Sequence, residues 1–378
     1  MKFHTKNVHF QTKEDGKNTS KTKPIYQTSA FSFQDLDDME SFYRGEKEYL
    51  YTRFSNPNTD DLAQGVAQLE EADAGVATSS GMSAILAGVL AVVKPGEHII
   101  ASEDLYGGTY QLFAVELVEL GIEVSFVSFE QLTEVKGAIK GNTKMIYTES
   151  ITNPLLRVED LQGVIALAKE HHLYTMIDNT FATPFLLQPM KLGADFVVHS
   201  ATKYIGGHSD VTAGVLVGKK ELIDLAKVKV VTLGCNLSPF EAWLACRGLK
   251  TLSVRMKKQC ENARFLAEAL HQSEHVLHVY YPTTVSSLGN GAMVSIELAN
   301  TVDIERFFAS LSWIKIAPTL AGVETTVSYP LRTSHRTVPD EIRNKLRITS
   351  GLVRISIGIE DEADILAEVK NAIKEAII

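Results

Sequence analysis

The sequence has few cysteines and no excess of positive charge, and each shortage excludes a class of protein. Only three of the 378 residues are cysteines, Cys235, Cys246 and Cys260, and they form no CxxC pair. An odd number without paired spacing supports neither a disulfide framework nor a zinc site, so we expect no metal and a reducing, cytoplasmic location. The formal net charge of −9 argues against a nucleic-acid partner, because no lysine- or arginine-rich face dominates.

A long apolar run is missing as well. The longest one covers residues 81–93, whereas a helix needs about 20 residues to cross a bilayer. The first residues, MKFHTKNVHFQTKEDG, lack the apolar core of a secretory signal. We therefore expect no membrane partner.

Nucleotide-binding motifs are incomplete or absent. Gly218-Lys219-Lys220 resembles part of a Walker motif, but no serine or threonine follows it, and Ala213 stands where the first glycine is needed. No GxGxxG sequence follows the first expected strand, which removes the main evidence for a nicotinamide dehydrogenase. Nucleotide hydrolysis and hydride transfer are therefore not supported.

The pattern of apolar residues divides the chain into three parts. Residues 1–60 are polar with scattered aromatics and predict an N-terminal arm. Residues 61–237 alternate between helical stretches and short apolar runs. Helices are expected at Asp61–Ala72, Gly81–Val93, Thr109–Leu120 and Leu161–His172, and strands at His98–Ala101, Val124–Val127, Met145–Thr148, Tyr174–Ile177, Phe196–Val198 and Val215–Val217. Such an alternation predicts an α/β domain with a mainly parallel central sheet covered on both faces.

Residues 238–378 predict a smaller C-terminal α+β domain. A long helical pattern runs from about residue 238 to Leu270, and the clearest strands after it are Met293–Leu298 and Leu352–Ile357. In the second of these strands, Val353 and Ile355 face one side while Arg354 faces the other. A closing amphipathic helix carries an apolar stripe made of Ile365, Leu366, Val369, Ile373 and Ile377.

Three of the expected strand and helix ends carry residues suited to one cofactor, pyridoxal phosphate. Asp178 follows the strand Tyr174–Ile177, where a carboxylate can keep a pyridine nitrogen protonated. Lys203 follows the strand Phe196–Val198, and a lysine can bind the cofactor carbonyl and then act as a base. Thr78-Ser79-Ser80-Gly81 precedes a helix, whose N-terminus offers N–H groups to a phosphate. The order and spacing of these elements favour a cofactor site over three unrelated caps and turns.

Longer motifs make this interpretation specific. The segment VVHSATKYIGGHSDVTAG, with MIDNTFATP before it and LVRISIGIED after it, resembles the Cys/Met-metabolism family of pyridoxal-phosphate (PLP) enzymes. That family includes cystathionine γ-synthase, cystathionine γ-lyase, methionine γ-lyase and O-acetylhomoserine sulfhydrylase. The match runs from KPIYQTSAF at residues 23–31 to the C-terminus and includes YLYTRFSNPN, DLYGGTY and TLAGVET. The resemblance implies the PLP-dependent transferase fold type I and a homo-oligomer, at least a dimer and commonly a tetramer.

The resemblance also implies roles for individual residues. Lys203 and Tyr106 are expected to be catalytic, Lys203 as the Schiff-base lysine and Tyr106 stacked on the cofactor ring, while Asp178 pairs with the pyridine nitrogen. The other expected cofactor contacts are Gly81, Met82, Ser200 and Thr202 on the phosphate, with Tyr51 and Arg53 reaching the phosphate of the neighbouring subunit. The expected substrate contacts are Asn153, Glu324 and Arg354, the Arg354 guanidinium gripping the α-carboxylate.

Several positions bear on the identity of the substrate. Methionine γ-lyases typically carry a cysteine where Gly108 stands here, which counts against methionine as the main substrate. Succinyl-using γ-synthases tend to carry basic residues where Phe54 and Gln111 stand, so a second carboxylate on O-succinylhomoserine lacks its expected partners. Glu324 matches a glutamate that can meet a distal substrate ammonium.

Together these residues predict γ-elimination or γ-replacement on sulfur amino acids or activated homoserine, of the cystathionine γ-synthase or γ-lyase type. O-acetylhomoserine sulfhydrylase and methionine γ-lyase are the alternative enzymes. A non-catalytic relative that uses the scaffold only for binding is the alternative outside catalysis. Such a relative would be expected to lose Lys203 or Asp178, and both are present.

Overall fold

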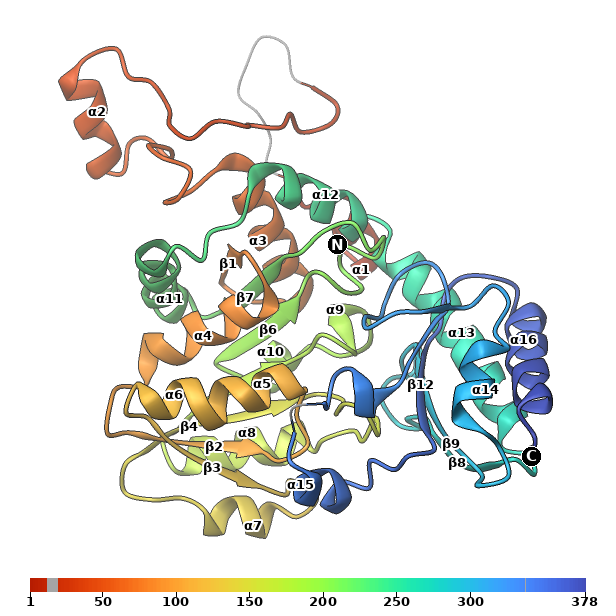
Figure 1. Ribbon diagram of the computed structural model, residues 1–378. Coiled ribbons are helices and arrows are strands. Elements are labelled where there is room, and N and C mark those ends of the chain that lie inside the picture. Colours follow the sequence, from red (N-terminus) through yellow and green to blue (C-terminus); the bar gives the residue numbers. More distant parts are fainter. Residues whose placement is uncertain (12–19, 337) are drawn as a thin grey trace.

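The computed structural model describes residues 1–11, 20–336 and 338–378, so part of the expected N-terminal arm lies outside the described residues. Two sheets organise the rest of the chain (Figure 1). The larger sheet has seven strands in the order β1-β7-β6-β5-β4-β2-β3, and the smaller has five in the order β10-β11-β12-β9-β8.

The larger sheet is mainly parallel, as the sequence predicts. The pairs from β6 through β5, β4 and β2 to β3 are parallel, while β7 runs antiparallel to both of its neighbours. The strands are β1 (Ala74–Thr78), β2 (His98–Ser102), β3 (Glu123–Val127), β4 (Thr143–Glu149), β5 (Tyr174–Asp178), β6 (Phe196–Ser200) and β7 (Gly214–Gly218). Every expected strand of this region is present, and β1 is an additional one.

Helices cover both faces of this sheet, which explains why its central strands are apolar along their whole length. In β7, Val215 and Val217 pack into the same cluster as α3 and α8, while Leu216 packs with α4 and α11. The covering helices are α3 (Pro57–Glu70), α8 (Leu161–Glu170), α4 (Gly81–Val92) and α11 (Lys220–Leu233). Polar residues collect at the carboxyl ends of the parallel strands, beside the N-terminus of α4.

The strand β1 was not predicted from the sequence, because its sequence, AGVAT, contains alanine and glycine, which are rare in strands. Its Gly75 has a packing reason: a Cβ there would lie 2.7 Å from the carbonyl oxygen of Ala63 in α3. Glycine therefore lets the α3 backbone lie directly against the sheet. Because β1 ends at Thr78, the Ser79-Ser80-Gly81 turn that follows it leads straight into α4.

The smaller sheet carries its apolar stripe on one face, against helices. Val353, Ile355 and Ile357 pack in one cluster with α13, α14 and α16, whereas Arg354 faces away from it, as expected. The elements are α13 (Leu252–Leu270), β8 (Val276–Tyr280), β9 (Met293–Leu298), α14 (Ile304–Ala309), β10 (Lys315–Ile316), β11 (Thr326–Ser328), β12 (Leu352–Ser356) and α16 (Glu362–Glu375). The helix α16 is shorter than expected, because it ends before Ile377, which is 41% exposed.

The helical stretch expected from residue 238 to Leu270 is two helices, α12 (Pro239–Leu249) and α13. The break leaves the Gly248 carbonyl without a helical partner, and Thr251 N–H and the Arg255 guanidinium both donate to it, at 3.0 and 2.8 Å. A buried arginine can thus stabilise a helix end that periodicity alone does not reveal. The stretch expected at Thr109–Leu120 is likewise three segments: α5 (Gly107–Gln111), the π-helical turn η1 (Leu112–Glu116) and α6 (Leu117–Glu119).

The first residues fold back onto the body of the protein. Asn7, in α1 (Phe3–Val8), is buried and donates to the Leu249 carbonyl, and Phe10 is 6% exposed. The segment at residues 20–56 extends away from the body and carries α2 (Leu36–Tyr43) (Figure 1). The remaining short helices are α7 (Leu132–Gly137), α9 (Thr183–Leu186), α10 (Pro189–Leu192), the 3-10 turn η2 (Pro330–Arg332) and α15 (Asp340–Lys345).

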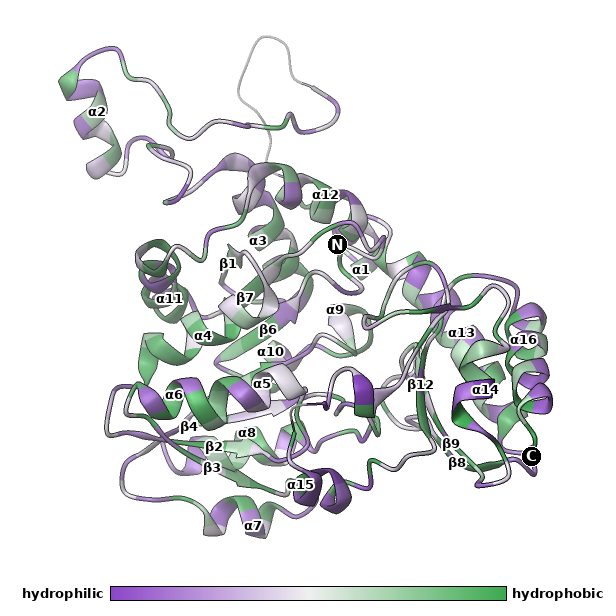
Figure 2. Ribbon diagram, viewed as in Figure 1, coloured by the Kyte–Doolittle hydropathy of each residue, from purple (hydrophilic) through white to green (hydrophobic). Residues whose placement is uncertain are grey.

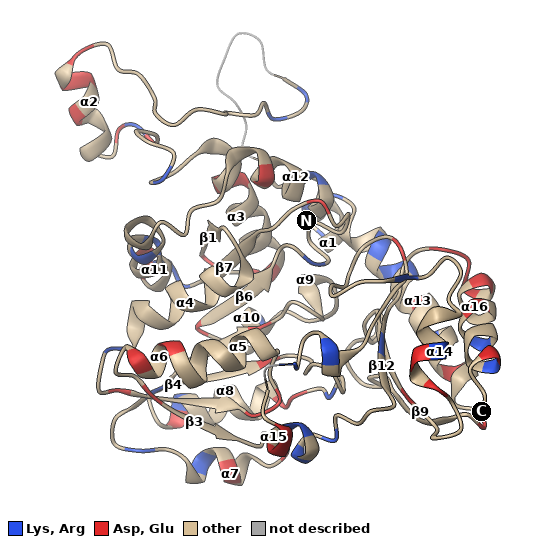
Figure 3. Cartoon of the chain, in the orientation of Figure 1, with Lys and Arg blue, Asp and Glu red and all other residues tan. Residues whose placement is uncertain are grey.

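The distribution of residue types follows this architecture. The strands of the larger sheet are mostly apolar, while α15 and parts of α14 and α16 are polar (Figure 2). Acidic and basic residues occur together on the outer helices α7, α15 and α16 (Figure 3). Within the described residues, no helix combines the length and the apolar character needed to cross a membrane.

Candidate active site

A cavity of about 390 Å³ opens between the carboxyl ends of β4, β5 and β6 and the smaller sheet. The larger sheet, the N-terminus of α4, the segment after β10 and the turn η2 all contribute to its lining. Sequence analysis named nine of the residues that line it: Gly81, Met82, Tyr106, Asn153, Asp178, Ser200, Thr202, Lys203 and Arg354. The fold therefore brings together residues that are up to 273 positions apart (354 − 81).

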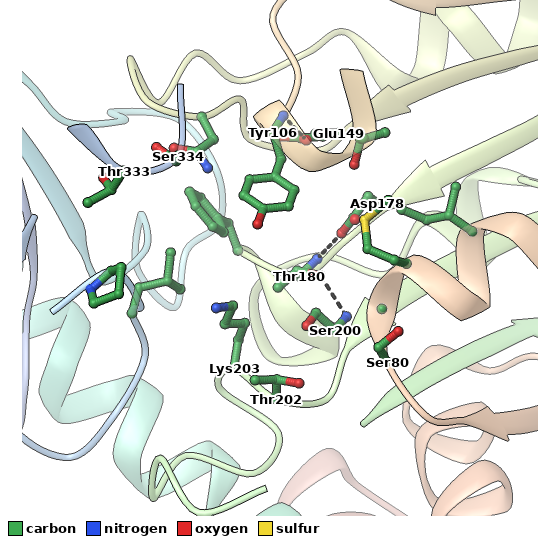
Figure 4. A pocket seen from close by; sticks show the side chains of 18 of the residues that line it. Ser80, Tyr106, Glu149, Asp178, Thr180, Ser200, Thr202, Lys203, Thr333 and Ser334 are labelled. Atoms are coloured by element: carbon green, nitrogen blue, oxygen red, sulfur yellow. Dashed lines mark hydrogen bonds between the residues drawn. The ribbon is translucent and has the colours of Figure 1, made fainter. Parts of the chain in front are cut away.

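Lys203 lies on the turn that follows β6 and points into the cavity (Figure 4). Its backbone N–H donates to the Ser200 carbonyl at 3.0 Å, and its Nζ donates to the Thr319 hydroxyl at 3.2 Å. Burial, with a smaller contribution from the positive charge of Arg354, lowers the pKa of Lys203 to about 8. A substantial fraction of this amine is therefore neutral near pH 8, which a nucleophile and a base both require.

Asp178 stands at the end of β5 and faces the same cavity. Burial raises the pKa of its carboxyl group, while hydrogen bonds from Thr180, including a backbone N–H at 2.9 Å, act in the opposite direction. The nearest parallel strand supplies Glu149 in register with it. A buried carboxylate of this kind fits a cationic ring nitrogen, which would compensate its loss of hydration.

The N-terminus of α4 forms a cradle for an anion beside Asp178. Ser80 caps the helix by accepting the Ser83 N–H at 3.1 Å. A Cβ at Gly81 would lie 2.8 Å from the Ser200 Cβ, so only glycine allows the helix to start this close to Ser200. The Ser200 N–H is in turn fixed by donation to the Thr180 hydroxyl at 2.8 Å (Figure 4). Free N–H groups, a helix dipole and hydroxyls fit a phosphate.

Arg354 reaches the cavity from β12 and is 3% exposed. Its Nη1 donates to the Asn153 side-chain oxygen at 2.8 Å, and its Nε donates to the Ser328 hydroxyl at 3.1 Å. Burial lowers its pKa to about 10, so the guanidinium still carries its charge at neutral pH. Two polar partners thus hold a buried cation in one orientation, ready for an anionic ligand.

Tyr106 forms the roof of the cavity (Figure 4). Its backbone N–H donates to the Glu149 carboxylate at 2.7 Å. A Cβ at Gly108 would lie 2.5 Å from Tyr106 Cε1, so the ring folds over a glycine. Burial, together with the charge of Asp178, raises the pKa of Glu149 well above its ordinary value.

Three of the residues named by sequence analysis do not line this cavity. Tyr51 and Arg53 lie together on the segment before α3, with the Arg53 guanidinium 5.6 Å from the Tyr51 ring centroid. Glu324 is exposed and pairs with Lys315 at 2.8 Å. Within this chain, none of the three contacts the site.

Sequence reasoning also missed several lining residues. Glu149 ends β4 and Thr180 follows β5. Ligands bind beyond the carboxyl ends of parallel strands, and this rule could have identified both residues from the sequence. Arg332, Thr333 and Ser334 belong to or follow η2, and they reach the cavity only through tertiary packing. No local pattern marks them.

Comparison with known proteins identifies the class of enzyme. The family model for Cys/Met metabolism PLP-dependent enzymes matches residues 4–374 of the chain. The chain belongs to this family. It is similar to a cystathionine beta-lyase of Lactococcus lactis subsp. cremoris (40% identical over 382 residues, 98% of each chain) and a cystathionine gamma-lyase of Bacillus subtilis (39% over 385 residues, 99% of this chain and 100% of the relative). The crystal structure of cystathionine gamma-lyase from Lactobacillus plantarum has the same fold, with a TM-score of 0.93, 35% identity and coverage of 100% of this chain and 99% of that one.

Family membership confirms three predictions from the sequence: the α/β fold of PLP-dependent enzymes, pyridoxal phosphate as the cofactor, and an enzyme of cysteine and methionine metabolism. The residues around the cavity fit that cofactor on structural grounds. The α4 cradle suits its phosphate, Asp178 suits its ring nitrogen, and Lys203 stands within the same cavity.

Proposed function

We propose that this protein cleaves or forms the bond between Cγ and sulfur in amino acids such as cystathionine, as a cystathionine γ-lyase or γ-synthase. The observation that carries the proposal is the convergence of Lys203, Asp178 and Arg354 on one cavity. A covalent anchor, an electrostatic partner for the ring and a carboxylate-binding guanidinium are the three groups that this chemistry needs.

In this proposal the larger sheet holds the cofactor. Gly81, Met82, Ser200 and Thr202 hold its phosphate, Asp178 pairs with its ring nitrogen, and Tyr106 covers its ring. When bound, pyridoxal phosphate supplies an electron sink for the negative charge that develops at the substrate Cα.

Lys203 moves the protons. With cofactor and substrate bound, the Lys203 amine would take the proton from Cα, and a second proton would leave Cβ before the bond from Cγ to its leaving group breaks. From cystathionine the leaving group is released as the cysteine thiol, and water then releases the remaining carbon skeleton as 2-oxobutanoate and ammonia. From an acylated homoserine the leaving group is released as the free carboxylic acid, and an incoming cysteine thiol adds at Cγ. The pKa of Lys203, lowered to about 8, suits a group that accepts and returns protons near neutral pH.

Arg354 orients the substrate in this scheme. Its guanidinium binds the α-carboxylate, while Asn153 and Ser328 hold the guanidinium itself. Fixing the carboxylate leaves the Cα proton in one position relative to Lys203, and such positioning accelerates proton transfer.

The test is the visible absorption spectrum of the purified protein, followed by addition of cystathionine. We expect a yellow protein whose band is absent in Lys203→Ala and which releases 2-oxobutanoate and cysteine. A yellow protein that ignores cystathionine but joins cysteine to O-acetylhomoserine would be a γ-synthase. A protein that pyridoxal phosphate cannot colour would contradict the whole proposal.

A second candidate is β-elimination, because one relative at 40% identity is named cystathionine beta-lyase. The two reactions break different bonds of the same substrate. Cleavage at Cβ releases pyruvate, ammonia and homocysteine, whereas cleavage at Cγ releases 2-oxobutanoate, ammonia and cysteine. Separating the two oxo acids after one turnover of cystathionine therefore distinguishes them.

We further propose that Tyr51 and Arg53 complete the site of a neighbouring copy in a homodimer, with tetramers formed from such dimers. Both residues precede α3 and lie outside the cavity of their own chain, which supports this. Co-expressing Arg53→Ala with Lys203→Ala tests it, since each mixed dimer contains one complete site. We expect about a quarter of wild-type activity from the mixture; recovery no greater than the sum of the two single variants would contradict shared sites.

A further inference from the structure

The walls of the cavity differ in charge. The wall formed by the larger sheet carries two acids, Glu149 and Asp178. The opposite wall contains Arg332, Thr333 and Ser334, and in the described part of the chain no acidic side chain lines it. Figure 4 shows this division, with Glu149 and Asp178 on one side of Tyr106 and Thr333 and Ser334 on the other.

The turn that carries Arg332 is fixed against the roof of the cavity. A Cβ at Gly107, next to Tyr106, would lie 1.9 Å from the Ser334 carbonyl oxygen. The Thr333 hydroxyl donates to the Tyr329 carbonyl at 2.8 Å, and the His335 N–H donates to the Pro330 carbonyl at 3.0 Å. The backbone position of Arg332 at the cavity is therefore set by packing, and only its side chain is free to move.

The Arg332 side chain is 66% exposed, and its guanidinium pairs with Glu305, which is 63% exposed. The same guanidinium lies 5.7 Å from the Tyr329 ring centroid. An ion pair between two exposed side chains contributes little, because water and salt screen it. A ligand carboxylate inside the cavity, where less water competes, can therefore take the place of Glu305.

The acid that the sequence suggested for the distal end of the substrate is not at this wall. Glu324 does not line the cavity, and its exposed side chain pairs with Lys315 at 2.8 Å. The Thr333 hydroxyl already donates to the Tyr329 carbonyl, and the Ser334 hydroxyl already pairs with Nδ1 of His335. The Arg332 guanidinium therefore supplies the hydrogen-bond donors at this side. Such a surface favours an anion over an ammonium group.

We propose that Arg332 determines specificity by binding a carboxylate on the departing part of the substrate. The preferred substrates are then amino acids with a carboxylate at each end, bound by Arg354 at the α-carbon end and by Arg332 at the other. Cystathionine and O-succinylhomoserine belong to this class, whereas methionine and O-acetylhomoserine do not. Phe54 and Gln111 offer no positive charge to the second carboxylate of such a substrate, and Arg332 supplies that charge instead. This inference rests on the proposed γ-elimination, which provides the assay.

The test compares two matched substrates, O-succinylhomoserine and O-acetylhomoserine, which differ in the terminal carboxylate. Release of 2-oxobutanoate gives kcat and KM for the wild type, Arg332→Ala and Glu305→Gln. We expect Arg332→Ala to raise KM for O-succinylhomoserine about 10-fold and to leave KM for O-acetylhomoserine and both kcat values within about twofold. We expect Glu305→Gln, which releases the guanidinium, to lower KM for the succinyl substrate alone. An unchanged cofactor absorption band in both variants establishes that the site is intact.

The outcomes separate the two proposals. If Arg332→Ala raises KM equally for both substrates, or for neither, Arg332 does not read the distal carboxylate, although γ-elimination stands. If the wild type, with its cofactor band present, releases no 2-oxobutanoate from either substrate or from cystathionine, and forms no cystathionine when cysteine is added to either substrate, the proposed function fails, and this inference fails with it.

Discussion

Replacing Arg354 with lysine tests how much the guanidinium group contributes to catalysis beyond its positive charge. Asn153 and Ser328 engage Nη1 and Nε, and within the described residues no hydrogen bond occupies Nη2. Nη2 and the second hydrogen on Nη1 therefore remain for the substrate α-carboxylate. Lysine keeps the charge but loses this fork, and with it one charge-assisted hydrogen bond worth about 1.5–3 kcal/mol. We expect Arg354→Lys to lower kcat/KM for cystathionine by roughly 10- to 150-fold.

The assay is initial-rate release of the oxo acid, with the cofactor absorption band and the thermal midpoint measured on the same samples. Arg264→Lys is the matched control, because that arginine is 65% exposed on α13, outside the cavity. It is expected to behave as the wild type. An Arg354→Lys variant within twofold of the wild type would refute the reasoning. A variant that loses its cofactor band or melts much earlier would assign Arg354 a structural role instead.

Three further predictions concern the cofactor. Because burial lowers the pKa of Lys203 to about 8, the fraction of neutral amine increases as the pH rises through 8. The rate at which pyridoxal phosphate colours the apoenzyme should therefore rise with pH and level off above about pH 9. A rate that still rises tenfold per pH unit at pH 10 would contradict this prediction. Gly81→Ala places a Cβ 2.8 Å from the Ser200 Cβ and should weaken cofactor binding about 10-fold or more, whereas Gly137→Ala, with no atom within 4 Å, should leave the dissociation constant unchanged. Asp178→Asn keeps the shape but removes the charge, so kcat should fall at least ~100-fold while the protein still binds pyridoxal phosphate; retention of full activity would show that the carboxylate is not needed.

The sequence by itself was sufficient for the α/β class, the mainly parallel sheet and nine of the residues that line the cavity. The reason is that these features are local: apolar runs mark buried strands, and the residues just after them fall at the sheet edge where ligands bind. Asp178 after β5, Lys203 after β6 and Gly81 at the start of α4 each carry this signal in their own neighbourhood. The motifs around them added the family.

Other features depended on the tertiary structure because no local pattern encodes them. The strand β1 is defined by pairing with β7, across 136 to 144 positions (214 − 78 and 218 − 74), and at the break between α12 and α13 the Gly248 carbonyl accepts from the buried Arg255. Arg332 lines the cavity because the turn that carries it packs against Gly107, and Glu324 lies outside the cavity in an exposed pair with Lys315. The residues proposed to hold the cofactor thus lie near the strand ends, whereas the wall proposed to meet the distal part of the substrate is assembled by packing between distant segments.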